Sequence, residues 1–422
     1  MKVDASVRVP GDKSITHRAL LLAGLTRGTS YIGGALTSLD AQSSARVLRQ
    51  LGADLSPLRK GATVTARGRG RFSRPAQTLF CGNSGTTTRL LLGLLSAHRF
   101  STTLTGDSSL RRRPMRRVTG PLAQMGARFS EQPHDGLPLT IRGGSLRPLR
   151  YEMPVSSAQI KSAILLAGMA GEVEVSVHEP NGRSRDHTER LLQAFGYGVT
   201  QNDGWIRFTP RGKLRPFEIQ IPGDPSSAAF LVGAAVLAES GELRITGIGV
   251  NPTRTGFLGV LERMGARVDM ESRSEHFGEP IADLIVRPAA LRATEVTAGE
   301  IPGLIDEIPL LAVLASRAEG ATTFRQVGEL RVKESDRLGL IAENLRAIGA
   351  EAEVAGDDLV VQGGESKPVG KVRTAGDHRL AMAFAVLGTL PGARIKIDNM
   401  ACAAVSFPGF PETLRDIAGA RR

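Results

Sequence analysis

One pattern recurs six times along this chain and constrains its fold more than any other feature. Each copy is a turn rich in Gly, Asp, Asn or Ser, followed by an almost entirely apolar segment long enough for a helix. The copies begin 71, 73, 68, 80 and 73 residues apart and together account for the 422-residue chain. Since self-similarity at a steady period indicates a repeat architecture, we expect one unit to occur six times. The copies begin at Gly11, Gly82, Val155, Gly223, Gly303 and Gly376.

A second, amphipathic helix is predicted after each apolar one. Val118, Leu122 and Met125, for example, follow the spacing of one helical face. Five of these segments end at a glycine, the residue that most easily adopts the left-handed conformation at a helix end, and a β-like run follows. A helix that is apolar on every face must be buried, so the first helices should form the centre of each half, with sheets around them. The terminating glycines are Gly52, Gly126, Gly196, Gly265 and Gly349.

The longest step and the Pro/Gly phrase at 221–227 predict a domain boundary near Gly223. The predicted fold class is α/β (α+β), with one domain of three repeats at 12–223 and a second of three repeats at 1–11 plus 224–422. The sixth unit ends after Leu414 without closing strands, and the N-terminal strand is predicted to complete it. An ordinary run of α/β units is the alternative, which the five matching glycine-terminated helices disfavour.

The formal net charge of +12 allows three kinds of partner: nucleic acid, anionic lipid or small anionic substrates. Cys81 and Cys402 are too few for a disulfide framework or a thiolate metal site, which favours a reducing, cytoplasmic location. The apolar stretches are shorter than the roughly 18 residues of a membrane span. The histidine spacings do not match a zinc motif, and the turn at Gly82 lacks the lysine of a nucleotide phosphate loop.

The predicted starts of the apolar helices share an anion-binding chemistry. Free backbone N–H groups and the helix dipole attract phosphate and carboxylate there, and cations and hydroxyl groups lie beside them. Ser14 and Asp377 could equally be plain N-caps, but recurrence in several repeats favours a function. If the halves face each other, these starts converge on one cleft suited to a small polyanion. The side chains concerned are Lys13, Ser14, Arg18, Asn83, Thr86, Arg89, Ser157, Gln159, Lys161, His378 and Arg379.

Two further segments concentrate charge. RRRPMRR at 111–117 has five arginines in seven residues, and a solvated or nucleic-acid-contacting patch is its simplest explanation. RVKESDRL at 331–338 is predicted to place Lys333, Glu334 and Arg337 on neighbouring parts of a helix surface, where a surface ion-pair cluster is the alternative to a function.

Taken in order, these motifs resemble the 5-enolpyruvylshikimate-3-phosphate synthase family, also called 3-phosphoshikimate 1-carboxyvinyltransferase. The phrases GDKSITHR, GNSGTTTR, SSAQIKSA, RVKESDRL and GDHRLAM carry a resemblance that spans almost the whole chain. It implies a two-domain inside-out α/β barrel of six βαβαββ repeats, three per domain, which closes over substrates at an interdomain cleft. The implied reaction transfers the carboxyvinyl group of phosphoenolpyruvate to the 5-hydroxyl of shikimate 3-phosphate and releases phosphate, on the pathway to chorismate and the aromatic amino acids.

The resemblance also implies roles for individual residues. Asp306 is expected to be the base on the 5-hydroxyl and Glu334 the proton donor to the methylene, with Lys13 and His378 assisting. No metal or organic cofactor is implied. The residues expected to hold shikimate 3-phosphate are Lys13, Ser14, Arg18, Ser157, Gln159, Arg185, Asp306 and Lys333. Those expected to hold phosphoenolpyruvate are Lys13, Asn83, Gly85, Thr86, Arg113, Gln159, Arg337 and Arg379.

Some positions depart from the pattern of the family. Val405 stands where some members have a lysine, and Ala158 follows Ser157 where some have a second hydroxyl residue. Gly85, rather than a bulkier residue, predicts sensitivity to glyphosate, the herbicide that occupies the phosphoenolpyruvate site of the family. A monomer without a nucleic-acid or membrane partner is expected.

Two other functions compete with this interpretation. The UDP-N-acetylglucosamine enolpyruvyl transferases share the fold and the co-substrate, but are expected to carry a reactive cysteine near the second repeat, where this chain has arginines. Cys81 instead lies in a strand-like run, where a buried, inert thiol is expected. A basic nucleic-acid-binding protein using 111–117 and 67–72 is the remote alternative.

Overall fold

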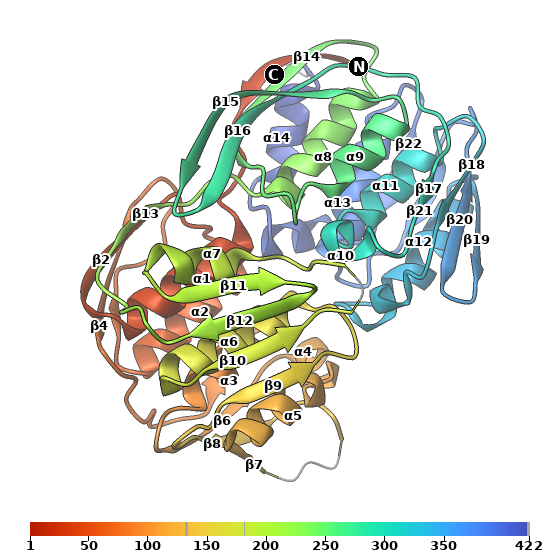
Figure 1. The fold of residues 1–422 in the computed structure, drawn as a ribbon. Helices are drawn as coiled ribbons and strands as arrows, with labels where there is room; N and C mark the ends of the chain where they lie inside the picture. Colours follow the sequence, from red (N-terminus) through yellow and green to blue (C-terminus); the bar gives the residue numbers. More distant parts are fainter. Residues whose placement is uncertain (131–133, 181, 420–422) are drawn as a thin grey trace. The chain divides into compact units, whose positions relative to one another are not determined.

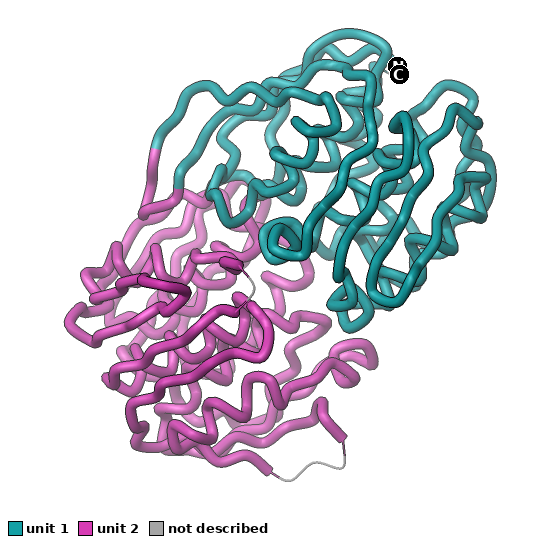
Figure 2. The backbone as a smooth tube through the Cα atoms, turned by 45° about the vertical axis from the view of Figure 1, so that its right-hand side comes forward, with its two compact units in different colours: residues 1–10, 222–274, 280–422 teal, residues 11–221, 275–279 magenta. Residues whose placement is uncertain are grey.

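The computed structural model describes residues 1–130, 134–180 and 182–419, so short pieces of both predicted domains lie outside the described residues. The chain divides into two compact units (Figure 2). Unit 1 comprises residues 1–10, 222–274 and 280–422, and unit 2 comprises residues 11–221 and 275–279. The chain therefore leaves unit 1 after its first ten residues and returns at Pro222.

All six predicted apolar helices are present, and almost every one of their side chains is buried. An aspartate caps several of them, because its carboxylate accepts a backbone N–H that has no partner within the helix. Asp12, for example, accepts from the backbone nitrogen of Ile15 at 2.8 Å. The helices are α1 (Lys13–Leu25), α3 (Gly85–Leu95) and α6 (Ala158–Gly171) in unit 2, and α8 (Pro225–Val236), α11 (Ile308–Ala315) and α13 (His378–Leu387) in unit 1.

The predicted amphipathic helices are also present, and the glycine that ends each of the first five has a positive φ, between 79° and 117°. A side chain would be strained in that conformation, so the glycine prediction is confirmed. These helices are α2 (Leu39–Gln50), α5 (Arg116–Met125), α7 (His187–Ala194), α9 (Gly256–Arg263), α12 (Arg337–Ala347) and α14 (Phe410–Ile417). Shorter helical segments are α4 (Ser108–Arg112), α10 (Ile301–Leu304), η1 (Gly328–Val332) and η2 (Met400–Val405).

Unit 2 contains three four-stranded sheets, each with one parallel pair at an edge and antiparallel pairing in the rest. The first sheet has the order β13 (Glu218–Gln220), β2 (Arg27–Gly33), β4 (Val64–Arg69), β3 (Asp54–Leu55). The second has the order β5 (Leu79–Phe80), β6 (Ser101–Thr105), β8 (Leu139–Arg142), β7 (Arg128–Phe129). The third has the order β11 (Gly198–Asn202), β12 (Trp205–Thr209), β10 (Val175–His178), β9 (Leu149–Glu152).

Unit 1 contains two four-stranded sheets and one two-stranded sheet. The first, which runs around one end of the unit in Figure 1, has the order β1 (Lys2–Val7), β14 (Ser240–Gly249), β16 (Glu279–Val286), β15 (Val268–His276). The second has the order β17 (Glu295–Val296), β18 (Ala321–Phe324), β20 (Asp358–Gln362), β19 (Glu351–Ala355). The third pairs β21 (Val369–Val372) with β22 (Arg394–Ile397).

The N-terminal strand does not complete the sixth repeat, and that prediction is wrong. β1 instead pairs in parallel with β14, from Lys2 opposite Ser240 to Val7 opposite Ile245. The edge of β14 is available because β13, the strand immediately before α8, pairs with β2 in unit 2. β1, which precedes α1, thus completes the sheet that follows α8. β13, which precedes α8, completes the sheet that follows α1.

The segment at 331–338 is also not a continuous helix. Helix α12 begins only at Arg337, because Asp336 caps it by accepting from the backbone nitrogen of Gly339 at 3.1 Å. Lys333 and Glu334 lie in the turn between η1 and α12. Arg337 is buried, which also excludes a surface ion-pair cluster at this position.

Each unit has its own apolar core, built around its three apolar helices. In the part of the chain that the structure describes, no helix combines the length and the apolar character needed to cross a membrane.

Candidate active site

In unit 2, the start of α1 carries the first predicted anion-binding group. Asp12 caps the helix, so Ser14 is not the N-cap. The Nζ atom of Lys13 lies 3.3 Å from Oδ2 of Asp40 on α2, and both side chains are mostly buried. An anionic substrate that reaches Lys13 must therefore share this cation with a carboxylate of the protein.

Arg18 lies one turn further along α1 and is buried against α6 and α7. Its Nε donates to Oγ1 of Thr188 and one Nη donates to Oγ of Ser162, both at 2.7 Å, while the other Nη donates to the carbonyl oxygen of Ser14 at 2.9 Å. Burial lowers the pKa of Arg18 to about 10, the charge of Glu189 acting against that shift. Three hydrogen bonds therefore hold the cation of Arg18 in place, one turn into α1.

Near the start of α3, the second apolar helix, Asn83 holds Arg113 in place. The amide of Asn83 donates to Oδ2 of Asp107 at 2.7 Å and accepts from Arg113 at 2.5 Å, so a neutral side chain separates the carboxylate from the guanidinium. Arg113 is buried, although Arg111 and Arg112 beside it are exposed. Of the first three arginines in the 111–117 segment, only Arg113 is thus part of this polar cluster.

Gln159 links the second and third helix starts of unit 2. Its amide nitrogen donates to Oγ1 of Thr86 at 3.0 Å, and its amide oxygen accepts from Arg89 at 2.5 Å. Gly85 is the first residue of α3 in this cluster, and a Cβ atom built there would lie 3.1 Å from Nη1 of Arg89 and 3.2 Å from Nη1 of Arg113. The glycine therefore lets the two guanidinium groups approach the end of the helix.

The remaining predicted residues of unit 2 lie on the flanks of these helix starts. Ser157 is the N-cap residue of α6, but its side chain makes no capping hydrogen bond. Arg185 precedes α7, is half-buried and lies close enough to Arg18 for its charge to lower the pKa of that guanidinium further. The structure thus groups the predicted residues of unit 2 around the starts of α1, α3 and α6.

In unit 1, the predicted residues gather around Arg337. Its Nε donates to Asp377 at 2.7 Å, and its two Nη atoms lie 3.3 Å from Asp306 and 2.5 Å from Glu334. Burial opposes the charge of Arg337, but Asp377, Glu334 and Asp306 raise its pKa overall. The two expected acid–base groups, which are 28 residues apart in sequence, therefore share one buried cation.

A second arginine holds Asp306 from the other side. Nη2 of Arg379 lies 3.2 Å from Oδ2 of Asp306, and Nη1 donates to the backbone oxygen of the same residue at 3.0 Å. His378, the first residue of α13, is buried. Lys333 is half-buried, and its pKa is lowered by burial first and by Arg337, with Asp306 acting against the shift.

Sequence reasoning missed the carboxylates that hold the predicted cations. Asp40 holds Lys13, Asp107 anchors Asn83, and Asp377 binds Arg337 while also capping α13 through the backbone nitrogen of Arg379 at 2.9 Å. Asp377 was visible as a candidate N-cap, but its second contact is with a residue 40 positions earlier. Such a double role has no local sequence signal.

The two units differ in charge. Unit 2 has 30 Lys and Arg residues against 16 Asp and Glu, whereas unit 1 has 24 against 26. The whole excess of positive charge therefore lies in unit 2, which carries three of the helix starts predicted to bind anions. Within the described ranges, no group of three or more His, Cys, Asp or Glu side chains is arranged to hold a metal ion.

Comparison with known proteins identifies the family. The model of the EPSP synthase (3-phosphoshikimate 1-carboxyvinyltransferase) family matches residues 1–414. The chain belongs to the EPSP synthase family. A 3-phosphoshikimate 1-carboxyvinyltransferase of Desulfitobacterium hafniense is 46% identical over 420 residues, covering 99% of this chain and 96% of the relative. One of Thermosynechococcus vestitus is 47% identical over 419 residues, covering 98% and 95%.

The solved structures agree with this assignment to the EPSP synthase family. An EPSP synthase of Acinetobacter baumannii superposes with a TM-score of 0.85 at 38% identity, covering 99% of this chain and 96% of that one. The enolpyruvyl transferase NikO of Streptomyces tendae, at 20% identity and a TM-score of 0.79, shares the fold. The resemblance predicted from the motifs and the mixed α/β fold class are both confirmed.

Proposed function

We propose that this chain transfers the carboxyvinyl group of phosphoenolpyruvate to the 5-hydroxyl of shikimate 3-phosphate and releases phosphate, in the biosynthesis of chorismate and the aromatic amino acids. It is a transferase of the EPSP synthase family. The structural observation that carries the proposed chemistry is the binding of Asp306 and Glu334 to Arg337. An addition followed by an elimination requires two such groups, one to take a proton from the hydroxyl and one to protonate the methylene.

Unit 2 supplies most of the proposed anion binding. Two phosphates and two carboxylates must be neutralised, and the starts of α1, α3 and α6 offer cations, amides and helix dipoles. We propose Lys13, Ser14, Arg18, Ser157, Gln159, Arg185, Asp306 and Lys333 for shikimate 3-phosphate, and Lys13, Asn83, Gly85, Thr86, Arg113, Gln159, Arg337 and Arg379 for phosphoenolpyruvate.

In the addition step, Asp306 takes the proton of the 5-hydroxyl of shikimate 3-phosphate, and the hydroxyl oxygen bonds to C2 of phosphoenolpyruvate. Glu334 protonates the methylene carbon in the same step. In the elimination step, the bond from C2 to the phosphate oxygen breaks, the departing phosphate takes the proton from Asp306, and the methyl carbon returns a proton to Glu334. Lys13 and His378 are proposed to assist these transfers.

The contacts of Arg337 suggest how Glu334 obtains its proton. Hydrogen bonds from a guanidinium favour an ionised carboxylate. The carboxylate of phosphoenolpyruvate, when it binds Arg337, competes with Glu334 for the same donor and places a like charge beside it. Both effects favour the protonated form of Glu334. Substrate binding would therefore prepare the acid that the addition requires.

We also propose the finer architecture implied by the family. It is an inside-out barrel of six βαβαββ repeats, three in domain 12–223 and three in domain 1–11 plus 224–422, with the substrate cleft between them. The boundaries of the compact units after Pro10 and Ile221 and the six buried apolar helices support it. A cytoplasmic, monomeric enzyme without a cofactor or nucleic-acid partner remains the prediction.

The test is phosphate release from shikimate 3-phosphate plus phosphoenolpyruvate, with UDP-N-acetylglucosamine as the competing acceptor. The wild type should release phosphate only with shikimate 3-phosphate. Asp306→Ala and Lys13→Met should be inactive. Their matched controls are Asp4→Ala and Lys60→Met, which alter exposed residues of the same units and should retain full activity. No release, or equal release with the nucleotide sugar, would contradict the proposed function.

A further inference from the structure

Unit 2 has a polar cavity at the opposite end of its apolar helices from the proposed substrate residues. Its volume is about 760 Å³. Leu25, the last residue of α1, Ala97, just after α3, and Met169, in the last turn of α6, line it. The 13 residues of α1 span about 20 Å, so this cavity is well separated from Lys13.

Cations from separate segments surround this distal cavity. Arg27 begins β2, Arg71 follows β4, and Lys213 lies in the loop after β12. These three exposed side chains make no ion pair with any residue that the structure describes. Arg99 also lines the cavity and donates to Oγ of Ser145 at 3.2 Å. Against these four cations, the lining residues include one carboxylate, Glu172, which leaves a net charge of +3.

The helix dipoles do not account for this charge by themselves. Cations are favourable beside the C-termini of helices, which explains Arg27 after α1 and Arg99 after α3. Arg71 and Lys213 follow strands instead, and α6 ends at the acidic Glu172. Like charges that outnumber the neighbouring carboxylates destabilise a folded protein, so an excess of cations around a concave surface favours an anionic ligand.

One wall of the distal cavity carries aromatic rings. The ring of His98 stacks on Phe72 at 5.2 Å with an interplanar angle of 22° and lies 5.7 Å from Phe100. Nδ1 of His98 donates to the backbone oxygen of Leu94, so Nε2 accepts from the backbone nitrogen of Phe72. Both nitrogens are used in the neutral form, and burial lowers the pKa of this imidazole.

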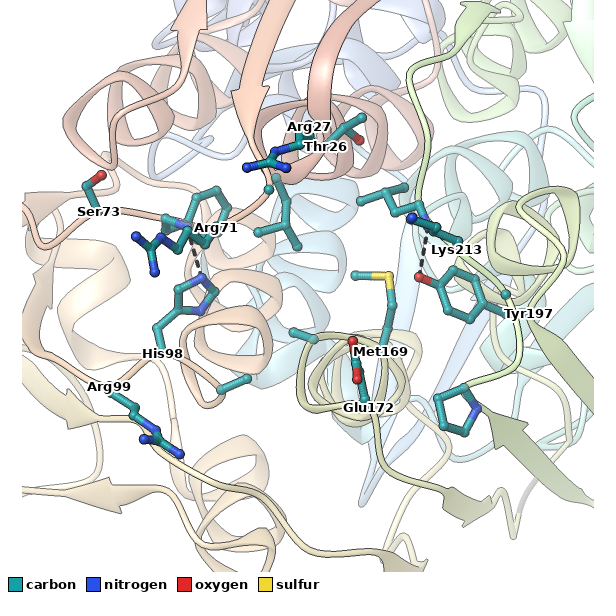
Figure 3. Close-up of a pocket in the computed structure, with 18 of the residues that line it drawn as sticks. Thr26, Arg27, Arg71, Ser73, His98, Arg99, Met169, Glu172, Tyr197 and Lys213 are labelled. Atoms are coloured by element: carbon teal, nitrogen blue, oxygen red, sulfur yellow. Dashed lines mark hydrogen bonds between the residues drawn. The ribbon is translucent and has the colours of Figure 1, made fainter.

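The other wall offers a hydrogen-bond donor. Figure 3 shows Tyr197 and Lys213 across the cavity from His98 and Arg71, with Arg27 at the rim between them and Met169 between the two walls. The hydroxyl oxygen of Tyr197 accepts from the backbone nitrogen of Leu214 at 3.1 Å, which leaves its proton available for a ligand.

We propose that this distal cavity binds an aromatic phosphate ester, the class that includes nucleoside monophosphates. The ring would lie against His98 and Phe100, with the buried Phe72 stacked on His98, and the phosphate beside Arg27, between Arg71 of one wall and Lys213 of the other. A volume of about 760 Å³ accommodates a ligand of this size. The site is additional to the proposed catalytic function and does not depend on it.

The test is calorimetric titration of the full chain with AMP and with phenyl phosphate. Inorganic phosphate and adenosine, which each carry one half of the proposed ligand, should bind at least tenfold more weakly than AMP. Arg71→Gln and Lys213→Gln should each weaken AMP binding about fivefold or more, because each removes a charge-assisted contact to phosphate. Phenyl phosphate should respond to the same two variants.

Two controls locate the bound ligand. Arg128→Gln changes an exposed arginine of the same unit outside the cavity, and Lys13→Met changes the proposed substrate site. Both should bind AMP like the wild type. Unchanged thermal melting of Arg71→Gln and Lys213→Gln would exclude unfolding as the cause of their weaker binding. Equal losses in Arg128→Gln, a loss confined to Lys13→Met, phosphate binding as tight as AMP binding, or no binding of AMP at millimolar concentration would each overturn the proposal.

Discussion

Replacing Lys161 by methionine tests whether a single buried cation stabilises unit 2. Its Nζ lies 2.8 Å from Oε2 of Glu179 and 2.7 Å from Oε1 of Glu189, and it donates to the backbone oxygen of Ser184 at 3.2 Å. The Lys161 and Glu179 side chains are 1% and 2% exposed, and that of Glu189 is 9% exposed. Methionine fills a similar volume but leaves two carboxylates buried without their cation.

The expected cost follows from this geometry. Removing one partner of a buried ion pair costs about 3 to 5 kcal/mol, because the remaining charge is uncompensated. In a unit of this size, each kcal/mol lowers the melting temperature by about 2 to 4 °C. We therefore expect a loss of roughly 6 to 20 °C in the transition of unit 2.

The pH dependence separates this explanation from simple loss of packing. Burial raises the pKa of Glu189 above its usual 4.5, against the opposing charge of Lys161, so removing that cation should raise it further. A carboxyl whose pKa is higher in the folded state contributes stability that is present at low pH and lost as the pH rises through that pKa. The penalty of Lys161→Met should therefore be smaller at pH 4.5 than at pH 8.

The assays are thermal unfolding for the melting temperature and urea unfolding for the free energy, both followed by tryptophan fluorescence. Trp205, the single tryptophan of the chain, lies on β12 in unit 2 and reports that unit specifically. Lys60→Met, at an exposed position of the same unit, is the matched control. The double variant Lys161→Met/Glu189→Gln should recover part of the stability. A penalty below about 1 kcal/mol, or one equal at both pH values, would refute the reasoning.

Three further predictions concern the proposed active site. Asp377→Asn keeps an oxygen to cap α13 but removes the negative charge that faces Arg337, so we expect the KM for phosphoenolpyruvate to rise about 10- to 100-fold. Asp336→Asn alters the cap of α12 and a 3.5 Å ion pair with the exposed Arg331, and should change that KM less than twofold. Asn83→Asp places a carboxylate against Asp107 and Arg113, which should weaken phosphoenolpyruvate binding in equilibrium titrations. The loss of affinity should be larger at pH 8 than at pH 5, and equal affinity at both pH values would contradict this prediction. Glyphosate should inhibit the wild type. Gly85→Ala should need a higher glyphosate concentration for the same inhibition, since the new methyl group would press on Arg89 and Arg113. Full wild-type activity at a large molar excess of glyphosate over phosphoenolpyruvate would refute the predicted sensitivity.

The helices of this protein were predictable from sequence because their signals are local. Apolar runs, capping aspartates and terminal glycines each act within a few residues of the position they define. Strand pairing has no such signal. β1 pairs with β14, and does not complete the sixth repeat, because β13 pairs with β2; both pairings join residues more than 180 positions apart. The start of α12 was missed because the spacing of Lys333, Glu334 and Arg337 resembled a helix face, whereas the cap at Asp336 decides the boundary.

The cations of the candidate site were predictable from sequence, whereas their carboxylate partners were not. Its cations recur at equivalent places in several repeats, so repetition predicted Lys13, Arg89 and Arg379, whereas Arg113 was predicted only from the family resemblance. Their carboxylate partners do not recur. Asp40 reaches Lys13 from α2, whereas Asp377 reaches Arg337 from its own cap position. Such partners depend on how neighbouring helices pack, which the period of the sequence does not specify.

The pairing of β1 with β14 has a consequence for how the chain is made. Synthesis proceeds at about 5 to 20 residues per second, so the first strand is synthesised roughly 12 to 50 seconds before residue 240 is added. During that interval the alternating strand, with the apolar Val3 between charged neighbours, has no partner, while unit 2 receives almost all of its own residues. Unit 2 can therefore fold before β1 has its partner strand. Unit 1 is completed only when β1, which is synthesised first, pairs with β14, which is synthesised more than 230 residues later.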